Sequence, residues 1–446
     1  MPNAEQHAQV SPTHYRPKFH LAPPIGRLND PNGLYFEHGV LHAYFQHDPQ
    51  WPIAGKRTGW GHAIAQISPG EPERWQHLPD ALYPAVDYDT HGCYSGSAVL
   101  VDGELELFYT GNAKPGGQRR ATQNLVHVVD RHAAHGGAHI RDAANPLIEG
   151  PAEGYTAHYR DPQVLFRDGQ WLMLLGAQRT DETGAVVLYT SADRRTWSFA
   201  GEITFDCSNA RLGDAPDLIP GGYMWECPNL IRLRDEVSNT DKDVLIILPQ
   251  GLDPVDHHYA NNHQCGYLVG QLEGTRFVVE RGFSELDYGT EFYAPQVVHN
   301  APEPWLVGWM GLPDQDDQPT AAEGWVHTLT MVRRLRLADG VLLQQPRAET
   351  TAFEVARGAR LTLVDTAGAE LMHFSVGDSW VELDRSAQLY HAGGDRRRGP
   401  LSSGDHPIDA RIVVDGSCVE AFFEDGRTSM SVRVFGNQPF GKIKVT

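Results

Sequence analysis

The sequence predicts an all-β protein that consists of a five-bladed β-propeller followed by a C-terminal β-sandwich. Five similar segments recur at nearly constant spacing along the first three quarters of the chain, each a small polar turn followed by an apolar run. Between them, short or alternating apolar runs separated by Gly, Pro, Asn and Asp clusters indicate strands, and helical periodicity is rare. After Arg334 the pattern changes to alternating strands joined by Asp-Gly turns, as in a small antiparallel sandwich.

The five segments predict the blades in order. They are NDPNGLYF, YSGSAVLV, RDPQVLF, WECPNLIRL and FYAPQVV, and we take as equivalent positions Asp30, Ser95, Asp161, Glu226 and Tyr293. These positions are 65, 66, 65 and 67 residues apart. A fixed period of strand units indicates a repeat fold, and equivalent positions of propeller blades lie at one height around a central axis. We therefore expect the three carboxylates among them to face one another across a single funnel.

The domain boundary is expected near the change of pattern. We predict the propeller over residues 12–338 and the sandwich over residues 339–446. The segment LRLADGVLLQQP is expected to be a hairpin that leads out of the propeller, and SWVELDRS, ARIVVDGSCVEAFFEDG and SMSVRVFG supply strands of the sandwich. A chain of 446 residues is long enough to bury two separate cores.

Composition restricts the partners and the compartment. The formal net charge of −20 disfavours nucleic acid and anionic membrane surfaces as partners. The sequence has no apolar stretch of 18 residues, so no membrane span is predicted. The first 20 residues lack the basic start and apolar centre of a signal peptide. The five cysteines are scattered and form no CxxC pair, which favours reduced thiols. We expect a cytoplasmic protein, and the oligomeric state stays open.

Three of the five repeat positions are carboxylates, which indicates an active site. An Asp before Pro is ordinary turn chemistry when it occurs alone, and a single buried Glu is often only paired. Three carboxylates at one phase of a repeat favour a functional cluster. Mutual repulsion raises at least one pKa, and a protonated acid beside an ionised carboxylate is the pair that glycoside hydrolysis needs. We expect the raised pKa at Glu226, between Trp225 and Cys227, and the ionised nucleophile at Asp30.

The motifs NDPNG, YSGS, RDP and WECP, in this order and spacing, resemble glycoside hydrolase family 32. Further matches are WGHA, LFYTGN, EFYAPQ and VDGSCVEAFFEDG, so the resemblance covers nearly the whole chain. It implies a five-bladed propeller with a β-sandwich. It also implies a retaining β-fructofuranosidase that removes the terminal non-reducing β-D-fructofuranosyl unit of sucrose or short fructosides through a covalent fructosyl-enzyme. No metal and no organic cofactor is implied, and the expected partner is a small sugar.

The resemblance assigns a role to each matching position. It implies Asp30 as the nucleophile, Glu226 as the acid/base and Asp161 as the transition-state stabiliser. The residues that it places at the fructose subsite or beside the acid are Asn29, Gln46, Trp60, Ser95, Arg160, Cys227 and Tyr293.

Three motifs depart from the usual family pattern: Arg27 and Leu28 replace Trp and Met, Asp48 replaces Asn, and Glu291 replaces Asp. Arg27 is expected at the rim, as a substrate-binding residue that selects the leaving group. The alternatives for Arg27 are a solvated rim residue or a partner of Asp48.

Several functional alternatives stay open. Within the family they are a fructan exohydrolase or a fructosyltransferase, and the substrate can be sucrose, sucrose-6-phosphate or a longer fructan. An inverting arabinanase-like glycosidase and a carbohydrate-binding protein without catalysis are the alternatives outside it. The histidines of DHHYANNHQC match no standard zinc spacing and are expected in a rim loop. Lys56 and Arg57 belong either to a solvated loop or to a contact with a phosphorylated sugar.

Overall fold

The computed structural model describes residues 14–54, 56–388 and 390–446. The predicted start of the propeller at residue 12 lies outside these residues. So does most of the N-terminal segment in which we expect no signal peptide. Within them the protein is nearly all β, as predicted, and the helical elements are two 3₁₀ turns, η1 (Pro115–Gly117) and η2 (Pro319–Glu323). No helix in these three ranges is long and apolar enough to cross a membrane.

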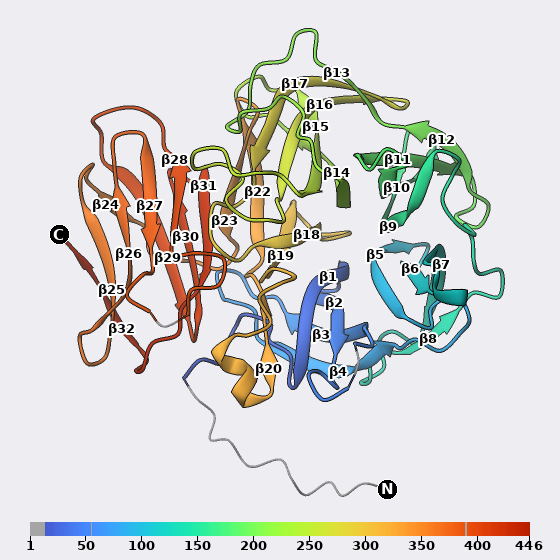
Figure 1. Cartoon of the computed structure of the whole chain (residues 1–446), viewed down its shortest axis with the longest axis horizontal. Helices are drawn as coiled ribbons and strands as arrows, with labels where there is room; N and C mark the ends of the chain where they lie inside the picture. Colours follow the sequence, from blue (N-terminus) through green and yellow to red (C-terminus); the bar gives the residue numbers. More distant parts are fainter. Residues whose placement is uncertain (1–13, 55, 389) are drawn as a thin grey trace, which may run out of the picture.

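The strands up to Pro346 form separate sheets arranged around a common centre (Figure 1). The first sheet has the order β20-β1-β2-β3-β4 and contains β1 (Gly26–Glu37), β2 (Val40–Asp48), β3 (Gly59–Gln66), β4 (Trp75–Leu82) and β20 (Trp325–Val326). The next has the order β5-β6-β7-β8 and contains β5 (Gly92–Val101), β6 (Glu104–Ala113), β7 (Arg120–Val129) and β8 (Ala138–Arg141).

The following sheets repeat this arrangement. The sheet β12-β11-β10-β9 contains β9 (Tyr155–Arg167), β10 (Gln170–Arg179), β11 (Gly184–Ser191) and β12 (Ser198–Glu202). The sheet β13-β17-β16-β15-β14 contains β13 (Thr204–Asp206), β14 (Met224–Arg234), β15 (Asp241–Gln250), β16 (Gly266–Glu273) and β17 (Arg276–Glu285). The sheet β18-β19-β22-β23, with β21 paired to β19, contains β18 (Tyr293–Val297), β19 (Trp305–Met310), β21 (Thr328–Leu329), β22 (Arg333–Ala338) and β23 (Val341–Pro346).

Local sequence explains the hairpins at the start of these sheets. The turn between β5 and β6 consists of Asp102 and Gly103, with φ of 51° and 76°, and the turn between β9 and β10 consists of Asp168 and Gly169, with φ of 51° and 82°. Two consecutive residues with positive φ fit a type I′ turn, whose twist matches that of antiparallel strands. The parallel pairing of β20 with β1 joins the last part of this region to its first strand.

The remaining strands form a two-sheet sandwich beside the propeller. One sheet has the order β24-β29-β30-β31 and contains β24 (Phe353–Val355), β29 (Ile408–Asp415), β30 (Cys418–Phe423) and β31 (Thr428–Arg433). The other has the order β28-β27-β26-β25-β32 and contains β25 (Arg360–Asp365), β26 (Glu370–Val376), β27 (Trp380–Asp384), β28 (Arg396–Pro400) and β32 (Phe440–Val445).

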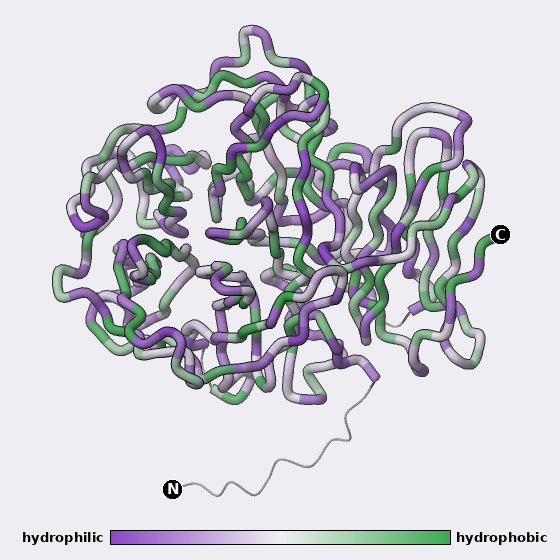
Figure 2. Tube along the Cα trace, turned by 180° about the vertical axis from the view of Figure 1, so that it is seen from behind, coloured by the Kyte–Doolittle hydropathy of each residue, from purple (hydrophilic) through white to green (hydrophobic). Residues whose placement is uncertain are grey.

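Alternate residues of both sheets, such as Leu361, Phe374, Ala421 and Phe423, form the buried core of the sandwich. Figure 2 shows hydrophobic stretches of the chain within both parts of the molecule. The predicted domain boundary after residue 338 falls in the turn between β22 and β23, which pair with each other in one sheet. The position of the boundary stays a prediction.

Candidate active site

A cavity of about 240 Å³ lies where the first strands of the sheets, β1, β5, β9, β14 and β18, converge. Nine of the predicted site residues line it: Arg27, Asn29, Asp30, Gln46, Ser95, Arg160, Asp161, Glu226 and Tyr293. Trp60 and Cys227 are buried behind the wall of the cavity. The Trp60 indole is fully buried and donates to the carbonyl of Tyr94 at 3.1 Å, so its role is to support the wall.

Each first strand leaves its regular pairing at the residues that reach the cavity. The register is interrupted between Leu28 and Pro31, Cys93 and Gly96, Arg160 and Gln163, Glu226 and Asn229, and Tyr293 and Gln296. A bulge turns side chains away from the alternation of the strand and is common next to active sites. The polar residues that open each repeated segment are therefore the residues directed into the cavity.

The backbone corrects the alignment of the repeats. Asp161, Cys227 and Ala294 each precede a proline and have positive φ, of 67°, 42° and 44°. They are therefore equivalent to one another, whereas Glu226 and Tyr293 come one residue earlier. The prediction that Glu226 and Tyr293 match Asp161 is wrong by one residue. Both side chains still reach the cavity because the bulge exposes two consecutive positions.

Asp30 is held by uncharged donors. The Asn29 amide donates to Oδ1 at 2.9 Å, and the Ser95 hydroxyl donates to Oδ2 at 2.5 Å. Burial and the nearby Glu226 raise the pKa of Asp30, while the two hydrogen bonds oppose that shift. Gln46 supports this arrangement because its amide donates to the Ser95 hydroxyl at 3.2 Å.

Glu226 is held by a cation and two further donors. Arg160 donates to Oε1 through Nε at 2.9 Å and through Nη2 at 2.5 Å, and Oε2 accepts from Tyr293 at 2.6 Å and from Gln250 at 2.5 Å. Burial favours the neutral acid, but the Arg160 charge and the Tyr293 hydroxyl outweigh it and lower the pKa of Glu226. The expected raised pKa at this position is therefore wrong. The residues next to Glu226 in the sequence are apolar, but the carboxylate itself is in contact with the Arg160 guanidinium.

Asp161, like Asp30, has a raised pKa. Its Oδ2 accepts from the Cys227 amide at 3.1 Å and lies 3.5 Å from the Cys227 thiol, while Arg160 Nε is 3.9 Å away. Burial raises the pKa of Asp161 to about 7, helped by repulsion from Glu226 and Asp30 and opposed by Arg160. One proton and two negative charges can thus be shared among the three carboxyl groups near neutral pH.

Arg27 lines the cavity but is neither a solvated residue nor a partner of Asp48, and its role in selecting the leaving group stays a prediction. It is 3% exposed, its Nε donates to Asp316 at 2.8 Å, and its Nη1 donates to the Asn29 side chain at 2.5 Å. Asp48 instead accepts from the backbone amides of Gln50 and Arg57. Arg27 therefore connects the acidic loop before η2 to Asn29, which binds the carboxylate of Asp30.

The cavity also contains residues that were not predicted: Thr58, Tyr94, Arg119, His158, Gln250, His263, Trp309 and Pro313. Strand pairing explains two of them, since Trp309 lies opposite Tyr293 and Gln250 lies opposite Met224, two residues before Glu226. His263 comes from the loop expected at the rim. Lys56 also lines the cavity, in agreement with one of its two predicted places.

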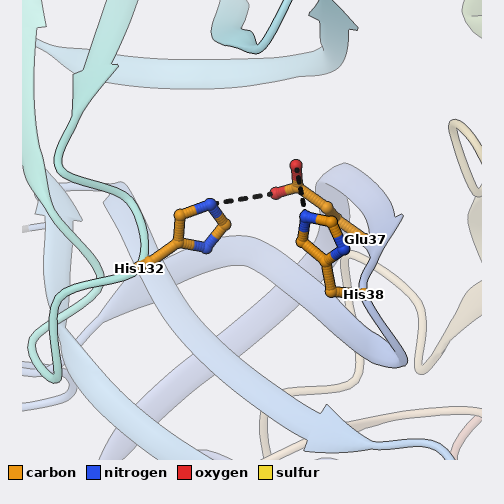
Figure 3. A group of neighbouring side chains, drawn as sticks. All are labelled: Glu37, His38 and His132. Atoms are coloured by element: carbon orange, nitrogen blue, oxygen red, sulfur yellow. Dashed lines mark ion pairs between the residues drawn. The ribbon is translucent and has the colours of Figure 1, made fainter.

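One group of side chains in the described ranges has the composition of a metal site, away from this cavity. Glu37, His38 and His132 lie together at the end of β1, with each histidine Nε2 3.7 Å from the Glu37 carboxylate (Figure 3). Both oxygens of Glu37 already accept hydrogen bonds from Arg131, at 2.8 and 2.7 Å. A guanidinium in that position repels a cation, so this arrangement is an ion-pair cluster.

Comparison with known protein families gives two adjoining matches. Residues 20–346 match the glycosyl hydrolases family 32 N-terminal domain, and residues 350–446 match the glycosyl hydrolases family 32 C terminal domain.

Individual proteins match over nearly the same length. The chain is 38% identical to a sucrose-6-phosphate hydrolase of Klebsiella pneumoniae, covering 96% of this chain and 90% of the relative. It is 32% identical to a raffinose invertase of Escherichia coli, covering 94% and 89%. Among solved structures, a sucrose-6-phosphate hydrolase from Lactobacillus gasseri matches with a TM-score of 0.79 and 30% identity over 97% of this chain and 91% of the other. A mutant β-fructofuranosidase of Bombyx mori in complex with sucrose matches with a TM-score of 0.77 and 25% identity over 97% and 93%.

Proposed function

The chain belongs to glycosyl hydrolase family 32, and from this premise we propose how its pocket hydrolyses a fructoside. It is a glycoside hydrolase of the invertase type with fructofuranosidase activity on sucrose-type substrates. The reaction proposed is retaining hydrolysis of the terminal non-reducing β-D-fructofuranosyl unit. The fold of the chain is a β-propeller followed by a β-sandwich. We propose that the propeller has five blades, one for each sheet whose first strand in the sequence is β1, β5, β9, β14 or β18.

Two carboxyl groups divide the chemistry. Asp30 attacks C2 of the fructosyl unit while Glu226 gives its proton to the glycosidic oxygen, so that the bond to the leaving sugar breaks and a fructosyl ester forms on Asp30. Glu226, now ionised, takes a proton from water, and the resulting hydroxide attacks C2 and releases fructose from Asp30. Asp161 and Arg160 flank these groups and fix the charge of the pocket.

The contrast between the environments of Asp30 and Glu226 carries this assignment. Asp30 accepts hydrogen bonds from the uncharged side chains of Asn29 and Ser95, and it forms no ion pair with a cation in the described ranges, which leaves a localised negative charge suited to attack. Glu226 shares a pocket with Asp161, whose carboxyl group retains a proton up to about pH 7. A sugar oxygen against Glu226 excludes water and raises the pKa of that group, which favours transfer of the shared proton to Glu226.

Trapping the intermediate tests the nucleophile. With a fructosyl donor whose ester hydrolyses slowly, denatured protein should contain one added fructosyl mass on the peptide that includes Asp30. Asp30→Asn should give no label. Recovery of the label on Asp161 would reverse the assignment of nucleophile and stabiliser. Inversion of the anomeric configuration in the first product would instead favour the arabinanase-like alternative, and predominant sugar products at high sucrose would favour a fructosyltransferase.

For the leaving group, we propose a sugar phosphate. Lys56 and Arg119 line the cavity, and neither has a carboxylate within 4.0 Å in the part of the chain that the structure describes. The Lys56 ammonium has no hydrogen-bond partner there, and Arg119 contacts only uncharged rings, His158 at 3.4 Å and Tyr94 at 6.0 Å from the ring centre. Unpaired cations at the mouth of a pocket favour an anionic substrate. This fits the relatives named sucrose-6-phosphate hydrolase.

A cytoplasmic location is proposed on two grounds. The five cysteines are free thiols, as expected in a reducing compartment. A phosphorylated substrate is charged and does not cross membranes unaided. Cell fractionation with an antibody against the chain tests this location.

A further inference from the structure

The segment before β18 is hydrogen-bonded to the sandwich as well as to β22 and β23 of its own sheet. The Tyr288 amide donates to the carbonyl of Ser429 at 2.8 Å, and the Glu291 amide donates to the carbonyl of Ser431 at 3.2 Å. Both acceptors belong to β31, which lies at the side of the sandwich nearest the propeller (Figure 1). A Cβ at Gly289 would lie 1.9 Å from the Ser431 carbonyl oxygen, so glycine is required for this close approach.

A buried ion pair reinforces the same junction. Arg385, just after β27, donates to Glu291 Oε1 at 2.7 Å, and neither side chain is exposed. Glu291 Oε2 accepts from the Arg433 amide at 2.9 Å and from the Thr290 hydroxyl. Arg385 is itself held by the carbonyls of Arg433 at 3.0 Å and Gly394 at 3.1 Å. The charge of Glu291 is thus matched entirely by groups of the sandwich and one adjacent threonine.

This junction lies two residues from the catalytic pocket. Tyr293, the first residue of β18, follows Glu291 and Phe292 and donates to Glu226 Oε2. A displacement of Glu291 therefore moves the backbone that carries the Tyr293 hydroxyl. The residue between them is tightly packed: Phe292 is 2% exposed, and the Arg333 guanidinium lies 4.6 Å from the centre of its ring.

A second chain of hydrogen bonds leads from the same place to Asp30. Arg433 Nη1 donates to Gln318 Oε1 at 3.1 Å, and the Gln318 amide lies 3.0 Å from His327 Nδ1. His327 Nε2 is 2.8 Å from Asp316 Oδ1, the oxygen that also accepts from Arg27. Arg27 continues to Asn29 and Asp30, as described above. Both carboxylates proposed for the reaction are thereby connected to one point at the end of β31.

We propose that the C-terminal sandwich is a positioning element of the reaction, and that Arg385 is the residue through which it acts on the acid. Arg385 fixes Glu291, Glu291 fixes the start of β18, and the Tyr293 hydroxyl is thereby held against Glu226. The proposal rests on the function proposed above, in which Glu226 is the acid. The Glu at position 291, where the resemblance expects Asp, has the length to reach Arg385 from the segment before β18.

The competing role for Arg385 is docking of the two domains without effect on the chemistry. A matched control separates the two roles, because Arg347 forms a similarly buried pair with Glu73, with Nε 2.6 Å from Oε1 and 3% and 0% side-chain exposure. That pair joins the segment after β23 to the segment before β4 and is not hydrogen-bonded to the strands that carry Glu226 or Tyr293. Removing either arginine leaves a buried carboxylate unpaired and lowers thermal stability.

The test compares Arg385→Met with Arg347→Met at a temperature at which both variants are folded. We expect Arg385→Met to lower kcat on sucrose about 10- to 100-fold with a smaller change in KM, since misplacement of a catalytic group by about 1 Å costs that much. The loss should be smaller on a fructoside with an activated leaving group, which needs less help from an acid. The basic limb of the pH profile of kcat/KM should also move upward, because a weaker Tyr293 hydrogen bond stabilises the Glu226 carboxylate less.

Equal kcat and equal pH profiles for the two variants would overturn the proposal and leave Arg385 as a docking residue. If Arg385→Met does not fold, Arg385→Lys provides the test, since it keeps the charge but offers fewer and differently placed donors, and it should show a smaller change in the same direction. Glu226→Gln in the same assays tests the underlying function separately. Retained activity in Glu226→Gln would show that Glu226 is not the acid. A strong loss in Glu226→Gln, together with no effect of Arg385→Met, would reject only the proposed role of the sandwich.

Discussion

The Tyr293 hydroxyl and the Glu226 carboxylate are joined by a 2.6 Å hydrogen bond on the side of Glu226 opposite to Arg160. Glu226 is consequently surrounded by donors on both oxygens, and its ionised form is stabilised. An acid catalyst has to be protonated when the leaving oxygen departs. The strength of the contacts around Glu226 therefore sets the pH range over which the proposed reaction proceeds.

Replacing Tyr293 by Phe tests this relationship. A hydrogen bond to the ionised form lowers a pKa, so its removal should raise the pKa of Glu226 and move the basic limb of kcat/KM to higher pH. The maximal rate should fall about tenfold, since a hydrogen bond to a charged group contributes roughly 1.5–3 kcal/mol. Tyr189→Phe is the control, because its hydroxyl accepts from Tyr159 at 2.9 Å, outside the pocket. A basic limb that stays in place in Tyr293→Phe would contradict the prediction.

Glu226→Gln removes the proposed acid while keeping the shape of the side chain. Hydrolysis of sucrose should fall by about 10²- to 10⁴-fold, the usual contribution of a general acid/base group, and KM should change far less. A fructoside with an activated leaving group should form the ester faster than sucrose does in this variant. Near-normal turnover of sucrose would place the acid at another residue.

The repeat in the sequence was sufficient to predict the all-β class and the convergence of the carboxylates. Each of the five repeated segments lies in the first strand of a sheet. Its apolar run pairs with the next strand, whereas the pairing is interrupted at the residues that open the segment. The exact phase was not predictable. A bulge exposes two neighbouring residues, so Glu226 and Asp161 both enter the cavity although they are one position apart in the repeat.

The electrostatics of the pocket depended on contacts across sheets. Arg160 lies 66 residues before Glu226 and pairs with it more closely than with the neighbouring Asp161, because the bulges direct the Arg160 and Glu226 side chains toward each other. The partner of Arg27 came from a loop 289 residues away. Spacing along the chain carries no information on such pairs. Gln250 and Trp309 could be found only from the register of the hairpins.

Arg27→Met should lower activity by the same factor on sucrose, sucrose-6-phosphate and longer fructans. The reason is that Arg27 contacts Asn29, which orients Asp30, and does not extend toward the leaving group as a free cation. Asp316→Asn should show a smaller loss in the same pattern, because it weakens the partner of Arg27. Kinetics on the three substrates provide the measurement, and a change in their ratio would restore a role in selecting the leaving group.

A cluster of three histidines on β2, β3 and β8 should make the protein less stable in mild acid. His42 and His62 are 3.2 Å apart, and His139 lies 3.1 Å from the Tyr44 hydroxyl. Burial lowers the pKa of His42 and of His139 to about 4 and that of His62 well below its usual value. Between about pH 6.5 and 4 the unfolded chain binds protons that the folded protein does not, so the free energy of unfolding falls as pH falls, by about 1.4 kcal/mol per pH unit for each histidine.

Denaturant unfolding at several pH values measures this slope. His139→Gln keeps a hydrogen-bonding amide near Tyr44 but cannot be protonated, so its stability should decline less steeply over the same range. Identical slopes for this variant and the natural protein would show that His139 does not contribute to the effect.

Lys56 and Arg57 are adjacent in the chain, yet only Lys56 lines the cavity. Arg57 instead donates to the carbonyl of Pro84 at 2.7 Å and faces the ring of Tyr83. If the leaving sugar carries a phosphate, Lys56→Met should raise KM for sucrose-6-phosphate about tenfold and change KM for sucrose little, since an exposed charge pair contributes roughly 1 kcal/mol or somewhat more when partly buried. The preference for the phosphorylated substrate should also weaken at high ionic strength, as expected for a charge at the mouth of a pocket.

Arg57→Met is the matched control and should leave the ratio of the two KM values unchanged. An equal effect of Lys56→Met on both substrates would show that the ammonium does not contact a phosphate, and the proposed leaving group would then be an uncharged sugar.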